Sequence, residues 1–177
     1  MAQARFMLLL FTTVFLVTAA QAQDQAAGLA GAPGCGDPKV KFSVNTAAYQ
    51  QPARHEAGKA LVYFIEDDSN FSPISKPTTR AGVDGKWVGA THGNSYFSFS
   101  VDPGVHHLCA SWQSWGGKMA VVHFTAEAGG IYYFEVKNVS YGAANSTTED
   151  MSLTPLDSDE GALLADQYEL ITSQPKK

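Results

Sequence analysis

Short apolar runs alternate with turn dipeptides between Lys59 and Val136. The turn signals stand at nearly regular intervals: Asp84-Gly85, Pro103-Gly104, Gly116-Gly117 and Gly129-Gly130. Short strands separated in this way by glycine-containing turns are typical of antiparallel all-β proteins. The pattern predicts an antiparallel β-sandwich of immunoglobulin-like or transthyretin-like type with about seven or eight strands.

The first half of this region predicts two strands followed by a loop. Val40, Phe42 and Val44 alternate with polar neighbours, as in a half-buried first strand. Residues 61–65 are apolar at every position, which is typical of a strand that is covered on both faces or lies near the middle of a sheet. Residues 66–78 follow with an acidic cluster and two prolines, and we expect them to form a loop.

The second half predicts a hairpin, further strands and one helix. Residues 80–88 are expected to fold back about Asp84-Gly85, because this dipeptide tolerates the positive φ angles of a type I′ turn. Residues 138–149 are polar and small, which predicts a surface connection, and 151–153 are expected to add a short edge strand after it. Acidic and capping residues then precede Leu163, and they predict a short C-terminal helix over 159–167.

The N-terminus has the pattern of a secretory signal peptide. Arg5 precedes an apolar run from Phe6 to Val17, and the small-residue exit Ala20-Gln21-Ala22 follows. We expect cleavage after Ala22, no stable membrane insertion afterwards, and a periplasmic or extracellular location. The alternative is an uncleaved transmembrane anchor, although the apolar run is shorter than the roughly 18 residues that a spanning helix needs.

Four segments follow from these patterns. Residues 1–22 are the expected signal peptide, and 23–38, rich in Ala, Gly and Gln, are expected to be flexible. Residues 39–172 are the expected sandwich domain, and 173–177 are the tail. The 155 residues after the signal peptide suit one domain with a hydrophobic core of ordinary size.

Charge and cysteine content narrow the possible partners and the compartment. The formal net charge is -5 and there is no block of Lys or Arg, which argues against binding to nucleic acid. Only two cysteines are present, Cys35 and Cys109. Because export leads to an oxidising compartment, we expect them to form a disulfide. The alternative is two unpaired thiols with Cys109 packed in a strand.

Several motifs resemble a bacterial family of small exported domains whose function is unassigned, often lipoproteins or periplasmic proteins. They are the segments 58–63, 83–85 with 88–89, 103–108 and 130–134. The "VDG…VG…VDPGVHHL" pattern also resembles envelope β modules named for a Pro-Glu-Gly-Ala motif, although that word is absent here. The resemblance implies a fold and an exported location, and it supplies no catalytic residues.

The histidines do not predict a metal site. His106 and His107 are adjacent on a strand, so they point to opposite faces. If Gly116-Gly117 is a two-residue hairpin turn, Ala110 rather than either of them faces His123. We therefore expect no metal and no cofactor.

The sequence also argues against an enzyme. No Gly-x-Ser-x-Gly elbow marks a nucleophile. The acidic groups Glu66-Asp67-Asp68, Glu149-Asp150 and Asp157-Ser158-Asp159-Glu160 stand in expected loops or at a helix start, so they are interpreted as solvated charges. The expected protein is a non-catalytic binding or structural module of the periplasm or cell envelope, with an envelope protein or a glycan as its partner.

Exposed aromatic residues give the alternative hypotheses. Trp87 and Trp115 lie near expected hairpin ends, where a ring could stack on a sugar or anchor a protein. They are the possible ligand contacts of a carbohydrate-binding module, while packing over the sandwich edge is the competing interpretation. Trp112 is expected in the core. A third hypothesis is an accessory or inhibitor-like domain that inserts its 66–78 loop into a partner.

Overall fold

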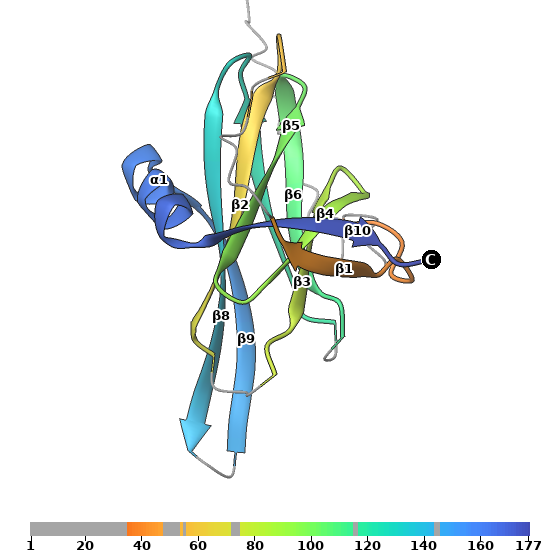
Figure 1. Cartoon of the computed structure of the whole chain (residues 1–177), viewed down its shortest axis with the longest axis vertical. Helices are drawn as coiled ribbons and strands as arrows, with labels where there is room; N and C mark the ends of the chain where they lie inside the picture. The colour runs from red at the N-terminus through yellow and green to blue at the C-terminus, as the bar shows by residue number, and fades with distance from the viewer. Residues whose placement is uncertain (1–34, 48–53, 55, 72–74, 115–116, 144–145) are drawn as a thin grey trace, which may run out of the picture. The chain divides into compact units, whose positions relative to one another are not determined.

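The computed structural model describes residues 35–47, 54, 56–71, 75–114, 117–143 and 146–177. These residues form a β-sandwich of two sheets with one helix (Figure 1). Ten strands are present within the described ranges, against an expectation of about seven or eight. The prediction of an all-β sandwich with a short C-terminal helix is confirmed in this coarse form.

The first sheet has six strands in the order β1-β10-β5-β2-β8-β9. Its pairing is mixed, because β2 runs parallel to β8 and β10 runs parallel to β5. The expectation of a purely antiparallel fold is therefore wrong for this sheet. In chain order its strands are β1 (Phe42–Thr46), β2 (Ala60–Asn70), β5 (Ser95–Val101), β8 (Ile131–Ala143), β9 (Ser146–Leu156) and β10 (Glu169–Pro175).

The second sheet has four antiparallel strands in the order β4-β3-β6-β7. They are β3 (Thr78–Val83), β4 (Lys86–His92), β6 (Gly104–Trp112) and β7 (Met119–Ala126). The hairpin between β3 and β4 turns at Asp84-Gly85 as predicted. Their φ angles are 49° and 79°, the positive values that a type I′ turn requires.

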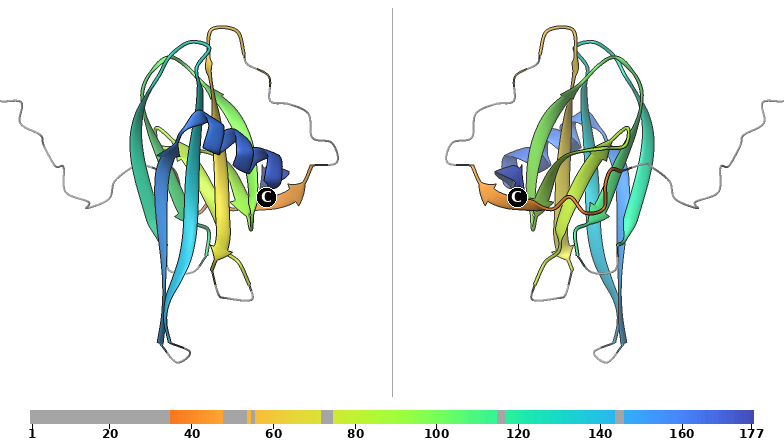
Figure 2. Two further views of the ribbon diagram at one scale, coloured as in Figure 1. Left: turned by 90° about the vertical axis from the view of Figure 1, so that its left-hand side faces the viewer. Right: turned by 90° about the vertical axis from the view of Figure 1, so that its right-hand side faces the viewer.

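β10 was not expected, and β9 is much longer than the short edge strand expected over 151–153. β9 and the end of β8 occupy the region predicted to be a surface connection, and they form a hairpin that extends past the other strands (Figures 1 and 2). From Ser140 onward the strand partners of β8 in the described part of the chain are all in β9. This part of the hairpin lies beyond the other strands, so the apolar alternation that predicts a half-buried strand is weak there. β10 pairs with β1 and reaches Pro175, beyond the expected domain boundary at 172.

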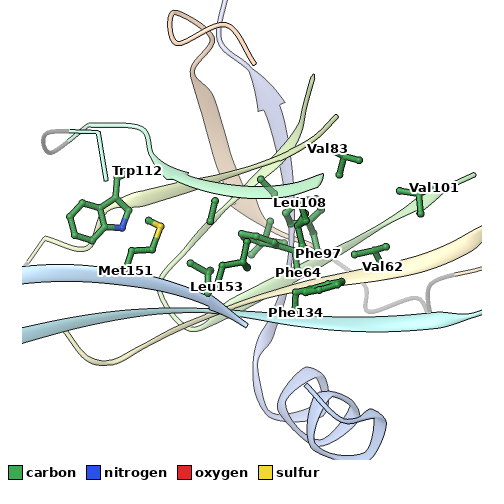
Figure 3. Packing of buried hydrophobic residues seen from close by; sticks show 14 of the residues in the cluster. Val62, Phe64, Val83, Phe97, Val101, Leu108, Trp112, Phe134, Met151 and Leu153 are labelled. Atoms are coloured by element: carbon green, nitrogen blue, oxygen red, sulfur yellow. The ribbon is translucent and has the colours of Figure 1, made fainter. Parts of the chain in front are cut away.

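Apolar side chains from both sheets meet in one core (Figure 3). Phe64 of β2 and Phe134 of β8 come from the first sheet, and Leu108 of β6 faces them from the second. Each is at most 1% exposed, and full burial of such a side chain stabilises the fold by roughly 1.5–3 kcal/mol. Trp112 is 2% exposed, so its predicted core position is confirmed.

The helix α1 (Ser158–Gln167) packs on the outer face of the first sheet. Its contact is made at Gly161, where a Cβ atom would overlap the ring of Tyr133. Tyr133 in turn stacks on Tyr63 of β2 at 4.7 Å between ring centroids. This packing covers β2 from outside, in agreement with the prediction that residues 61–65 are covered on both faces.

A segment that we call the N-terminal strap, Cys35–Lys41, lies across the outer face of the second sheet. The Cys35–Cys109 disulfide fixes it to β6, with 5.4 Å between the two Cα atoms. This confirms the expected pairing. Gly82 of β3 allows the close approach, because a Cβ atom there would overlap the carbonyl oxygen of Cys35. Residues 35–38 of the segment expected to be flexible are therefore tied to the sheet.

No helix in the described part of the chain is long and apolar enough to cross a membrane.

Candidate functional site

The interior of the sandwich becomes polar toward the C-terminal end of β2. Glu66 and Asp68 continue the inward-facing positions of this strand beyond Phe64, since residues two apart share a strand face. Glu66 is fully buried and Asp68 is 2% exposed. Thr79 of β3 and Asn138 of β8 are fully buried beside them, so the cluster joins the two sheets.

Asn138 is the centre of this cluster. Its Nδ2 donates to Glu66 Oε1 at 2.7 Å and to Asp68 Oδ1 at 2.6 Å. Thr79 Oγ1 donates to the same oxygen of Glu66 at 2.5 Å. Trp112 Nε1 donates to Asn138 Oδ1 at 2.8 Å, which fixes the orientation of the amide. The carboxyl groups are thus held by neutral donors from β3 and β8, and β6 orients one of these donors.

Two carboxyl groups in one buried space retain their protons more strongly than exposed ones. Burial raises the pKa of Glu66 well above its ordinary value, and the negative charge of Asp68 raises it further, against hydrogen bonds that include those from Thr79 and Asn138. Burial also raises the pKa of Asp68. Glu66 Oε2 and Asp68 Oδ2 have no hydrogen-bond partner among the described residues.

The interpretation of Glu66-Asp67-Asp68 as solvated loop charges is wrong. All three residues belong to β2, and none is more than 7% exposed. Carboxylates are depleted in strands, so composition alone favoured a loop. A usable signal was present, because Phe64, Glu66 and Asp68 keep the period of two that begins in the apolar run.

The cluster holds the strands of the two sheets in one arrangement, and its carboxyl groups are not accessible to a substrate. Glu66 and Asp68 are enclosed, and their hydrogen bonds run between strands of the two sheets. Within the described ranges, no group of three or more His, Cys, Asp or Glu residues could hold a metal ion. The arrangement acts as a polar contact that sets the relative position of β2, β3 and β8.

A cavity of about 280 Å³ opens beside the disulfide, between the N-terminal strap and the outer face of the second sheet. Arg80 and Trp87 form its polar and aromatic walls. Further lining residues are Cys35, Pro38, Ser111 and Met119. Met119 is 50% exposed and lies on the edge strand β7, so it borders the cavity from the side of the solvent.

Arg80 is a buried cation that has no acidic partner within the described chain. Its Nη1 donates to the carbonyl oxygens of Pro38 at 3.2 Å and Val40 at 2.8 Å. Its Nη2 donates over longer distances, 3.4 Å, to Ser111 Oγ and to the Trp112 carbonyl oxygen. Nε has no described acceptor, and burial lowers the pKa of the guanidinium. The positive charge is thus compensated by carbonyl and hydroxyl dipoles and by the Trp87 ring, without an anion among the described residues.

Trp87, a predicted ligand contact, lines this cavity and is half-buried. Its Nε1 donates to the Asp37 carbonyl oxygen at 2.7 Å, and the guanidinium of Arg80 lies 4.2 Å from its ring centroid. The ring therefore holds the N-terminal strap while it faces the cavity. Trp115, the other predicted contact, lies outside the described residues.

The histidines occupy two different environments on β6. His106 is held by protein acceptors: Nδ1 lies 2.6 Å from Asp84 Oδ2, and Nε2 lies 2.6 Å from the Asp102 carbonyl oxygen. His107 points to the outer face and stands opposite His123 of β7. Their rings stack with centroids 4.2 Å apart.

The expectation that Ala110 faces His123 is wrong. It assumed a two-residue turn at Gly116-Gly117, whereas β6 ends at Trp112 and β7 begins at Met119. The longer connection shifts the register, so that Ala110 pairs with Ala120. The shift brings His107 and His123 together.

Comparison of the sequence with protein-family models and with curated proteins found no match. The resemblance to small exported bacterial domains therefore remains a prediction from the motifs quoted above.

Proposed function

We propose that this chain is an exported, non-catalytic β-sandwich module that binds a partner or ligand in the periplasm or cell envelope, or outside the cell. The disulfide between Cys35 and Cys109 supports an oxidising compartment. The enclosure of Glu66 and Asp68 supports a binding rather than an acid–base role for the domain. Its immunoglobulin-like or transthyretin-like type is part of the same proposal.

The observation that carries the proposal is the cavity beside the disulfide, with its buried and unpaired cation. A guanidinium removed from water is costly unless an anion or several good acceptors compensate it. Arg80 has no anionic partner among the described residues, and two of its hydrogen bonds are long. A ligand carboxylate would supply the missing charge, while Trp87 and Met119 offer apolar contact to the rest of the ligand.

The matching ligand is a small anionic group with an apolar neighbour, such as the carboxylate of a peptide or of a peptidoglycan fragment. We expect such compounds to quench or shift the fluorescence of Trp87 in a saturable way. The measurement is a titration with acidic peptides, peptidoglycan fragments and neutral glycans, and a Trp87→Phe variant assigns the signal. A panel in which no compound changes the fluorescence would contradict the proposed site.

A charged substitution at the edge of the cavity distinguishes binding at this site from nonspecific binding. Because Met119 is half exposed, Met119→Glu leaves the core intact and places a carboxylate beside the cavity. We expect it to weaken binding of an anionic ligand about tenfold through like-charge repulsion. Met119→Gln is the matched control: it removes the same apolar contact without adding a charge, so it should bind the anionic ligand more tightly than Met119→Glu does. Equal binding by both variants would place the ligand elsewhere.

The carbohydrate hypothesis for Trp87 and Trp115 is tested by the neutral glycans in the same panel. Trp87 gives it little support, because the Arg80 guanidinium already lies over its ring. Saturable binding of a neutral glycan that is lost in Trp115→Ala would favour it over the anion site.

Export is tested by intact mass. We expect protein recovered from the periplasm or the medium to begin at Gln23 and to carry the disulfide. Its mass should then be about two units lower than that of the same sample after reduction. Protein that keeps residues 1–22 and two free thiols in the cytosol would contradict this part of the proposal.

A further inference from the structure

His107 and His123 form an exposed imidazole pair on adjacent antiparallel strands. They are direct partners in the register of β6 and β7, and both side chains point to the outer face of the second sheet. Directly opposed residues have Cβ atoms about 4.5–5.5 Å apart, which lets the ends of two imidazoles reach the same point. Their ring centroids are 4.2 Å apart and the ring planes are inclined by 21°, so the rings stack, and rotation about the side-chain torsions would turn one nitrogen of each toward a shared ion.

These two rings differ from the other described histidines in having no hydrogen-bond partner. The ring of His106 is held by Asp84 and Asp102, and the ring of His92 lies 3.2 Å from the Pro77 carbonyl oxygen. In the described part of the chain, neither His107 nor His123 has an acceptor or donor on its ring. Their nitrogens are therefore available to an external partner.

The charge around the pair favours a cation. Asp84 Oδ1 accepts a hydrogen bond from the backbone N of His107 at 2.9 Å, which places a carboxylate next to the pair. Asp84 is engaged by His106 and His107, so it supplies negative potential rather than a ligand atom.

We propose that His107 and His123 chelate a divalent transition-metal ion on the outer face of the second sheet. Imidazole is the commonest protein ligand for such ions, and among first-row divalent metals Cu²⁺ binds nitrogen ligands most tightly. The pair provides two ligands, and water or a group from a binding partner completes the coordination. Because the ion would join β6 to β7 at the sheet edge, it would also stabilise this hairpin.

The test is a titration of the full protein, purified without a polyhistidine tag, with CuCl₂, NiCl₂ or ZnCl₂ by calorimetry. We expect one equivalent of Cu²⁺ to bind, and its electron paramagnetic resonance spectrum to show coupling to two imidazole nitrogens. His123→Ala and His107→Ala should each weaken binding about 100-fold, because the second imidazole of a chelate binds intramolecularly. Both positions are exposed, so the variants are expected to fold.

Two controls make the result specific. Thr125→Ala removes an exposed side chain from the same face of β7 and should leave Cu²⁺ affinity unchanged. The melting temperature of each variant without metal shows whether the fold is retained, and only the wild type and Thr125→Ala should be stabilised by added Cu²⁺. Absence of micromolar binding by the wild type, or equal affinity in all variants, would overturn the proposal.

Discussion

The buried carboxyl group of Glu66 links the stability of the fold to pH. Burial and the charge of Asp68 raise the folded-state pKa of Glu66 above the value of the unfolded chain, near 4.3 for a model glutamate. Its contribution to stability is therefore fully present below about pH 4.3. The contribution is lost as the pH rises from there through the raised folded-state pKa, since unfolding then releases the proton.

Replacement of Glu66 by Gln should flatten this dependence. Glu66→Gln keeps an oxygen acceptor for Asn138 and Thr79 and removes the ionisable proton. Between about pH 5 and about pH 8 we expect the variant to lose less unfolding free energy than the wild type. Urea denaturation at each pH measures the free energy of unfolding. Glu160→Gln, at an exposed glutamate of α1, is the control and should keep the wild-type pH dependence. Parallel profiles for wild type and Glu66→Gln would contradict the assignment.

Some residues could be placed from the sequence and others could not. Asp84-Gly85 was predictable because a two-residue turn depends on local backbone preferences. The partner of Glu66 was not, because Asn138 lies 72 residues away along the chain and nothing local indicates that its amide reaches this carboxyl. Arg80 is a similar case, since its partners at Pro38 and Val40 belong to the distant N-terminal strap.

Among the elements, α1 depends on one glycine for its position. Gly161 lies against the ring of Tyr133 with no room for a Cβ atom. We expect Gly161→Ala to lower the free energy of unfolding by about 1–3 kcal/mol, because the added methyl group forces the helix away from the sheet. Urea denaturation followed by circular dichroism measures the effect.

The matched control for this prediction is Leu163→Ala in the same helix. Leu163 is 56% exposed, so its truncation should change stability by no more than about 0.5 kcal/mol. Alanine favours a helix over glycine by about 1 kcal/mol, so Gly161→Ala would stabilise the protein if the methyl group met no obstacle. A Gly161→Ala variant that is as stable as the wild type, or more stable, would show that the helix is free to move.

The strands also differ in how well periodicity predicts them. β2 begins with a strong apolar run, and a strand was expected there. The register of β6 and β7 depends on the length of the connection between them, which glycine pairs indicate only ambiguously. The parallel pairing of β2 with β8 joins segments far apart in sequence, and no local pattern encodes it.

At the scale of the whole molecule, the disulfide closes a loop across the first five strands and the start of β6. Cys35 and Cys109 are separated by 74 residues, and in the chain-entropy model such a bond stabilises the fold by about 4 kcal/mol. We expect Cys35→Ser to lower the unfolding free energy by this amount. Denaturant unfolding with and without a reducing agent measures it.

The reducing agent provides the internal control. It should destabilise the wild type and leave Cys35→Ser unchanged. The double variant Cys35→Ser with Cys109→Ala tests whether a free thiol on β6 contributes to the effect. A wild-type protein whose stability does not respond to reduction would show that the hydrogen bonds of Trp87 and Arg80 suffice to hold the N-terminal strap.

The same bond determines the path of mechanical tension through the domain. A pulling force applied to the chain ahead of Cys35 passes through the two sulfur atoms directly into Cys109 in the middle of β6. The backbone from 36 to 108 carries none of this force. In an oxidised protein stretched by its N-terminal end, strands β1 to β5 are therefore shielded from extension until the covalent bridge is broken.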